Sequence, residues 1–143
     1  MTLYAETSAV LRWLFGEPDG REVREALSAA SKVTCSRLTA IETRRVIRRA
    51  EREARITAAQ RADVLAVFAQ AASTWAILEL VDDVARRADE GFPSEPVRTL
   101  DAIHLASALF LRESFPDLVL LTADDRIRTN ATQLGLPCAI PTK

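Results

Sequence analysis

Leu118-Val119-Leu120-Leu121 (LVLL) is the stretch that decides the fold. Four consecutive apolar residues that follow Pro116-Asp117 are typical of a strand buried on both faces of a parallel sheet. Before this stretch, the apolar spacing predicts a helix from Arg98 to the Pro116-Asp117 break. After it, a second helix is expected from Ala123 to about Leu134, with Gly135 as its C-cap. A strand between two helices predicts an α/β architecture.

The same alternation extends over the rest of the chain. Further strands are expected at Thr2–Glu6, Lys32–Ser36, Thr74–Val81 and Cys138–Ile140. Helices are expected after the N-cap candidates Thr7 and Ser8, from Pro18 to about Ala30, from Leu38 to about Arg55, after the N-cap Thr57, and from Asp82 to about Glu90. The helices on either side of Arg55–Thr57 should form an antiparallel hairpin. Strands separated by helices predict a three-layer α/β/α fold with a mainly parallel sheet of about four to five strands. Without a repeat or linker, residues 1–143 are expected to form a single domain.

Composition narrows the class of protein. The 143 residues are 48% hydrophobic and 27% charged, which is typical of a globular protein. No leader peptide is recognisable, and no apolar run approaches the ~18 residues of a transmembrane helix. We therefore expect a cytoplasmic protein that is not associated with a membrane. Cys35 and Cys138 lack CxxC spacing and are expected to be free core residues.

Acidic residues follow the predicted strands. In parallel α/β sheets, ligands bind outside the carboxyl ends of the strands. Glu6 ends the first strand and Asp124 follows LVLL, while Glu42 and Asp101 lie early in helices beside apolar residues. Burying several carboxylates together is unfavourable, and Mg²⁺, which prefers oxygen ligands, removes that penalty. The sequence thus favours a divalent-metal site at this edge.

Structural interpretations of the same acids stay open. Asp101 and Asp124 both lie at helix starts, where a negative charge offsets the helix dipole. Glu42 can be an exposed ion-pair partner of Arg45 or Arg49, and Glu6 can be a surface residue.

Four segments of the chain resemble the motif regions of PIN domains, with the closest likeness to VapC-type toxins of bacterial toxin–antitoxin pairs. They are YAETSAVLRW (Tyr4–Trp13), SRLTAIETRRVIRRA (Ser36–Ala50), LDAIHLASAL (Leu100–Leu109) and LLTADDRIRTNATQLGL (Leu120–Leu136). The resemblance implies a PIN-like fold and a catalytic pocket formed by Glu6, Glu42, Asp101 and Asp124. It also implies that Mg²⁺ or Mn²⁺ is bound by Glu6, Asp101 and Asp124, with Glu42 acting directly or through water.

The resemblance further implies an activity and partners. It implies an endoribonuclease that hydrolyses RNA phosphodiester bonds, with structured RNAs such as tRNA among its candidate substrates, a cognate antitoxin and a homodimer. The family usually has Asp where this chain has Glu6, whose side chain is one methylene longer. The alternative is therefore a catalytically weak or inactive PIN-fold protein that binds RNA or an antitoxin.

Five residues are candidates for accessory roles: Thr7, Ser8, Arg12, His104 and Asp125. Thr7 or Ser8 can hydrogen-bond a ligand carboxylate. His104, three residues after Asp101, can hydrogen-bond an acid, although packing as a neutral residue in an apolar helix is favoured. Asp125 is expected to serve as an outer-shell group or as a surface partner of Arg128, and Arg12 to face a substrate groove.

Arginines are concentrated in one helix. They are Arg44, Arg45, Arg48, Arg49, Arg52 and Arg55. A solvated face paired with Glu51 and Glu53 is one interpretation, and contact with an RNA backbone or an antitoxin is the other. Trp13 and Phe15 can likewise pack in the core or line an interface.

Several enzyme classes are excluded by missing motifs. The chain has no GxxxxGK[ST] for a P-loop NTPase, no GxGxxG for a dinucleotide-binding domain and no GxSxG for a serine hydrolase.

Overall fold

The computed structural model describes residues 1–139, and their strands form one parallel sheet. The sheet has five strands in the order β3-β2-β1-β4-β5. The strands are β1 (Thr2–Ala5), β2 (Lys32–Ser36), β3 (Ala76–Leu78), β4 (Val119–Leu121) and β5 (Cys138–Ala139). Every neighbouring pair is parallel, so the predicted α/β/α fold with a parallel sheet is confirmed.

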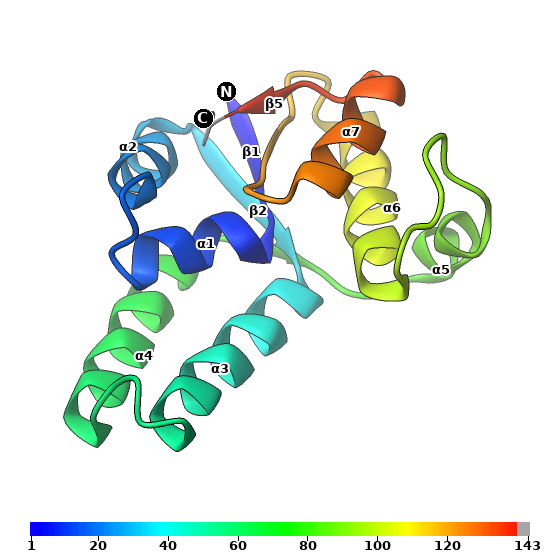
Figure 1. The fold of residues 1–143 in the computed structure, drawn as a ribbon. Helices are drawn as coiled ribbons and strands as arrows, with labels where there is room; N and C mark the ends of the chain where they lie inside the picture. The colour runs from blue at the N-terminus through cyan, green and yellow to red at the C-terminus, as the bar shows by residue number, and fades with distance from the viewer. Residues whose placement is uncertain (140–143) are drawn as a thin grey trace.

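In the described part of the chain, seven helices connect and cover these strands. They are α1 (Thr7–Leu14), α2 (Gly20–Ala29), α3 (Arg37–Arg52), α4 (Ala58–Ala72), α5 (Asp82–Asp89), α6 (Thr99–Ser114) and α7 (Asp125–Gln133). Figure 1 shows α1 to α4 on one side of the sheet and α5 to α7 on the other. The expected hairpin is formed by α3 and α4, and Thr57 and Gln60 form a capping box at the start of α4.

The central strand β1 is buried on both faces because its side chains alternate between two cores. Tyr4 packs with Leu120 and with the α6 and α7 side, whereas Leu3 and Ala5 face the α1 to α4 side. Leu118 and Leu120, from the stretch that predicted the fold, are fully buried. The core thus lies on both sides of β1 and β4, as predicted for a parallel sheet.

Two glycines are required by local geometry. A Cβ on Gly20 would lie 2.3 Å from the backbone oxygen of Arg12, so a side chain there would push α2 away from α1. Gly135 has φ +77°, in the left-handed region that glycine adopts without strain, and it follows α7 as predicted.

Some predicted boundaries were wrong. The strand expected at Thr74–Val81 is only Ala76–Leu78, and Leu80 and Val81 are exposed. Thr7 and Ser8 are the first residues of α1 and do not cap it, because Glu6 does so. Ile140, expected in the last strand, lies outside the described residues. Cys35 and Cys138 are both free, as expected, but only Cys35 is buried in the core, and Cys138 is partly exposed. Within residues 1–139, no helix has the length and apolarity needed to cross a membrane.

Candidate active site

Glu6 lies at the carboxyl edge of the sheet, where β1 and β4 end side by side. Ala5 pairs with Leu121, and the backbone N–H of Glu6 donates to the Leu121 carbonyl at 3.0 Å. The residues that follow the two strands therefore meet, and Thr122 Oγ1 donates to Glu6 Oε1 at 2.6 Å. Glu6 is only 4% exposed, so its carboxylate depends on hydrogen-bond donors from the protein.

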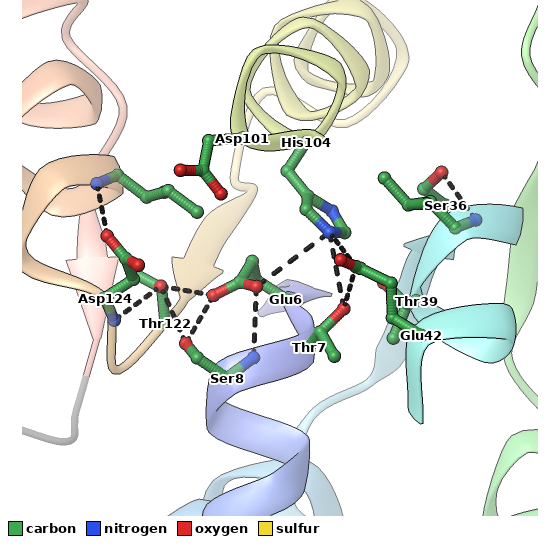
Figure 2. Close-up of polar contacts among 12 residues, drawn as sticks. Glu6, Thr7, Ser8, Ser36, Thr39, Glu42, Asp101, His104, Thr122 and Asp124 are labelled. Carbon is green, nitrogen blue, oxygen red and sulfur yellow. Dashed lines mark hydrogen bonds and ion pairs between the residues drawn. The ribbon is translucent and has the colours of Figure 1, made fainter. Parts of the chain in front are cut away.

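Those donors come mainly from the first turn of α1. Ser8 donates to Glu6 twice, from its backbone N–H at 3.0 Å and from its hydroxyl in a short hydrogen bond. Glu6 thus caps α1 although glutamate is not among the preferred N-cap residues. The two bonds from Ser8 and the one from Thr122 fix the carboxylate in one orientation (Figure 2).

Glu42, in the second turn of α3, is bound by Thr7 and His104. Thr7 Oγ1 donates to Glu42 Oε1 at 2.6 Å, and His104 Nε2 lies 2.7 Å from the same oxygen. Burial alone would raise the pKa of Glu42, but the hydrogen bonds from His104 and Thr7 outweigh it and the net pKa is lowered. Glu42 is therefore ionised at neutral pH, and it is not the ion-pair partner of Arg45 or Arg49 that the sequence also allowed.

His104 connects the two glutamates to the core. Its ring is 1% exposed, its Nδ1 lies 2.8 Å from the Tyr4 hydroxyl, and its Nε2 lies 3.9 Å from Glu6 Oε2. Burial raises the pKa of the Tyr4 phenol well above its usual value, so Tyr4 keeps its proton and is the natural donor to Nδ1. The proton of a neutral imidazole then lies on Nε2, where Glu42 accepts it. His104 is thus buried as expected, but within a polar network and not only among apolar side chains.

Asp101 and Asp124 approach the same edge from two other helices. Asp101 lies in the first turn of α6, and its side chain is 15% exposed. Among residues 1–139, the only hydrogen-bond or ion-pair partner of this side chain is Arg98, at 3.4 Å. Asp124 is the N-cap of α7 and accepts from the Ile127 N–H at 3.0 Å. In Figure 2 the carboxylates of Asp101, Asp124 and Glu6 lie to one side of His104, and Glu42 lies to the other.

Thr122 links two of these acids and was not singled out from the sequence. Its hydroxyl donates to Glu6 and accepts from the backbone N–H of Asp124 at 3.1 Å. Tyr4 was missed as well. The sequence signal that can find it is general, because a tyrosine in a buried strand needs a partner for its hydroxyl.

The remaining accessory candidates lie outside this hydrogen-bonded cluster. Asp125 is exposed and pairs with Arg128 at 3.3 Å, the surface pairing that the sequence allowed. Arg12 lies 3.7 Å from Asp19 and lines a groove between α1 and α3.

The acidic residues fit a hard divalent cation by the chemistry of their atoms. Within residues 1–139, no three Asp, Glu, His or Cys side chains are arranged as a ready-made metal site. Their oxygens are nevertheless the ligands that Mg²⁺ and Mn²⁺ prefer, and Asp101 is partly buried with only one long contact to a cation. Without a cation, the carboxylates of Glu6, Asp101 and Asp124 repel one another and any phosphate group.

Comparisons with known proteins agree with this fold. No curated protein sequence matches the chain. Among solved structures, FitAcB from Neisseria gonorrhoeae has a TM-score of 0.68 at 17% identity, covering 97% of each chain. A toxin–antitoxin complex from Klebsiella pneumoniae gives 0.64 at 23% identity, with 100% of this chain and 99% of that chain covered.

A third structure is the toxin VapC20 from Mycobacterium tuberculosis, described as cleaving the sarcin–ricin loop. Its TM-score is 0.60 at 14% identity, covering 89% of this chain and 93% of that chain. At these identities the likeness shows the fold. The family model of the PIN domain, however, matches residues 3–132, and the chain therefore belongs to the PIN domain family.

Proposed function

We propose that this protein is a Mg²⁺- or Mn²⁺-dependent endoribonuclease, and that it is the toxin of a toxin–antitoxin pair. The observation that carries the proposal is the convergence of Glu6, Asp101 and Asp124 at one sheet edge, from β1–α1, α6 and α7 (Figure 2). VapC20, which shares the fold, is described as a toxin that cleaves the sarcin–ricin loop.

Each side chain has a role in this proposal. Glu6, Asp101 and Asp124 would hold the cation, which when bound would activate water and offset the charge that develops on the phosphodiester. Ser8 and Thr122 orient Glu6 through their hydrogen bonds. Thr7 and His104 hold Glu42 by one oxygen, so its other oxygen remains available to orient a water molecule.

The proposed partners are a cognate antitoxin and a second copy of the chain, and the proposed location is the cytoplasm. Several large apolar side chains are exposed and available for such contacts, namely Ile41, Val67, Leu80, Val81 and Leu100. The structure from Klebsiella pneumoniae that shares the fold is described as a toxin–antitoxin complex, which supports an antitoxin partner.

A catalytically weak or inactive PIN-fold protein that binds RNA or an antitoxin is the second candidate. The observation that favours it is the hydrogen bonding of Glu6, since both carboxylate oxygens already accept bonds from Ser8 or Thr122. A cation would have to share these oxygens with their present donors.

The two candidates differ in RNA cleavage. Purified protein is incubated with a panel of structured RNAs that includes tRNAs, in Mg²⁺, in Mn²⁺ and in EDTA. Cleavage in either metal that stops in EDTA is the expected result. RNA binding without cleavage by folded protein would replace the nuclease with the binding protein.

A further inference from the structure

A row of arginines on α3 begins beside the acidic edge. Arg45, Arg49 and Arg52 follow Glu42 at i+3, i+7 and i+10. At about 100° per residue, these positions lie within about 80° of Glu42 around the helix axis. We call Arg45, Arg49 and Arg52 the arginine row. It leads from the site along one side of α3.

The charges of the row are poorly balanced by the protein itself. All three side chains are exposed. Within residues 1–139, Arg45 and Arg52 have no ion pair or hydrogen bond, and Arg49 has only a 4.0 Å contact with Glu53. Like charges three or four residues apart on a helix repel each other. An anionic ligand along the row would remove that repulsion.

A groove between α1 and α3 runs beside the row. It has a volume of about 530 Å³, and Arg12, Arg49 and Arg55 contribute three cations to its walls, against one carboxylate from Glu17. Leu11, Phe15, Val46 and Ile56 supply apolar surface. Ser8 lines the same groove and hydrogen-bonds Glu6, so a ligand in the groove reaches the acidic edge.

We propose that the arginine row and this groove bind the sugar–phosphate backbone of single-stranded RNA next to the bond that is cut. The inference rests on the proposed nuclease function and adds the path of the substrate. Guanidinium groups bind phosphate oxygens in pairs of hydrogen bonds. A strand that must approach several carboxylates needs cations close by to offset their repulsion, and the row supplies them.

The apolar part of the groove favours RNA over an acidic protein segment. Phe15 lies among the arginines and presents an aromatic side chain to the groove. Bases stack on aromatic side chains without sequence preference, while phosphates follow neighbouring cations. A glutamate-rich segment would use the cations but has no flat group to place on Phe15.

The test is the salt dependence of RNA binding. All proteins carry Asp101→Asn and are kept in EDTA, so that the labelled oligouridylate probe stays intact. The row variant is Arg45→Gln/Arg49→Gln/Arg52→Gln. The control is Arg21→Gln/Arg24→Gln/Arg86→Gln, which removes three exposed charges from α2 and α5. Thermal melting checks that each variant is folded.

The slope of log K against log salt is negative, and the row variant is expected to make it shallower by about 2. The reason is that each of the three lost phosphate contacts on a single strand contributes about 0.7. The control should keep the parent slope. Equal losses in both variants, or no loss in the row variant, would overturn the inference. Polyglutamate is the competing ligand. If it binds as tightly as the RNA and loses as much affinity in the row variant, the row would be assigned to an acidic protein, and the proposed RNA path would be overturned.

The same experiment distinguishes a failure of the proposed ribonuclease function from a failure of the proposed RNA path. If the parent protein binds no RNA at any salt concentration, the ribonuclease proposal is refuted, and the substrate path with it. If the parent binds RNA with an unchanged slope in the row variant, only the path is refuted.

Discussion

Tyr4→Phe tests the buried network behind the acidic edge. The change deletes one hydroxyl from a side chain that is 0% exposed and leaves the ring in place. The ring can keep its edge contact with the His104 imidazole, whose centroid lies 6.0 Å away. What is lost is the 2.8 Å hydrogen bond to His104 Nδ1, which leaves a buried acceptor without its donor.

An unsatisfied buried polar group costs about 1–3 kcal/mol. For a chain of this size, each kcal/mol lowers the melting temperature by about 3 °C, so Tyr4→Phe should lower it by about 3–9 °C. Urea unfolding and thermal melting measure the loss. The control is Thr129→Val, which removes an exposed hydroxyl on α7 and should change stability by less than about 0.5 kcal/mol.

The same network has a spectroscopic signature because His104 is the only histidine. A long-range ¹H–¹⁵N spectrum of the imidazole should show a proton on Nε2, the nitrogen that lies 2.7 Å from Glu42 Oε1. In Tyr4→Phe the Nδ1 resonance should shift while the proton stays on Nε2, since Glu42 still accepts it. A proton on Nδ1 in the unmodified protein, or a Tyr4→Phe variant as stable as the control, would refute the reasoning.

Three further predictions concern other groups. Glu42 has a lowered pKa when folded, so its contribution to stability is complete above its ordinary pKa of 4.5 and is lost as pH falls through the folded value. The urea midpoint of the wild type minus that of Glu42→Gln should therefore shrink below about pH 4.5, and a constant difference would contradict the assignment. Asp101→Asn should raise the melting temperature without metal, because it removes a like charge beside Glu6 and Asp124, and should weaken stabilisation by Mn²⁺. A variant that gains as much from Mn²⁺ as the wild type would place the ion elsewhere. Thr57→Ala should lower the free energy of unfolding, measured with urea, by about 1 kcal/mol because it breaks the capping box of α4. Thr57→Ser keeps the capping hydroxyl and should retain most of the wild-type stability.

The fold class could be predicted from the sequence because the central strands are short, apolar and separated by helices. LVLL and Lys32–Ser36 both became strands of the sheet. The order of the strands was not readable, since pairing depends on contacts between distant segments. The third strand was overestimated because an apolar run such as Thr74–Val81 does not reveal where its pairing ends, and Leu80 is exposed.

The position of the acids in the fold could be predicted from the sequence, whereas the hydrogen-bond network around them could not. Parallel strands and helix starts bring Glu6, Asp101 and Asp124 to one edge, which topology alone predicts. The partners of His104 are Tyr4, 100 positions away, and Glu42, 62 positions away, and helical periodicity describes only one helix at a time. The capping role of Glu6 could not be predicted either, because it depends on the conformation of a long side chain that accepts a hydrogen bond from the Ser8 N–H.

The most direct test of the metal-dependent ribonuclease is the rate of RNA cleavage in Mg²⁺ or Mn²⁺ by three proteins: wild type, Asp101→Asn and Asp125→Asn. The two variants remove the same charge, but Asp125 is exposed and pairs with Arg128 on the surface. Cleavage by the wild type should stop in EDTA. Asp101→Asn should lower the rate by more than about 100-fold, the upper limit for an outer-shell group, and Asp125→Asn should leave it nearly unchanged. Cleavage that survives in EDTA, or that is equally fast in Asp101→Asn and Asp125→Asn, would contradict the account.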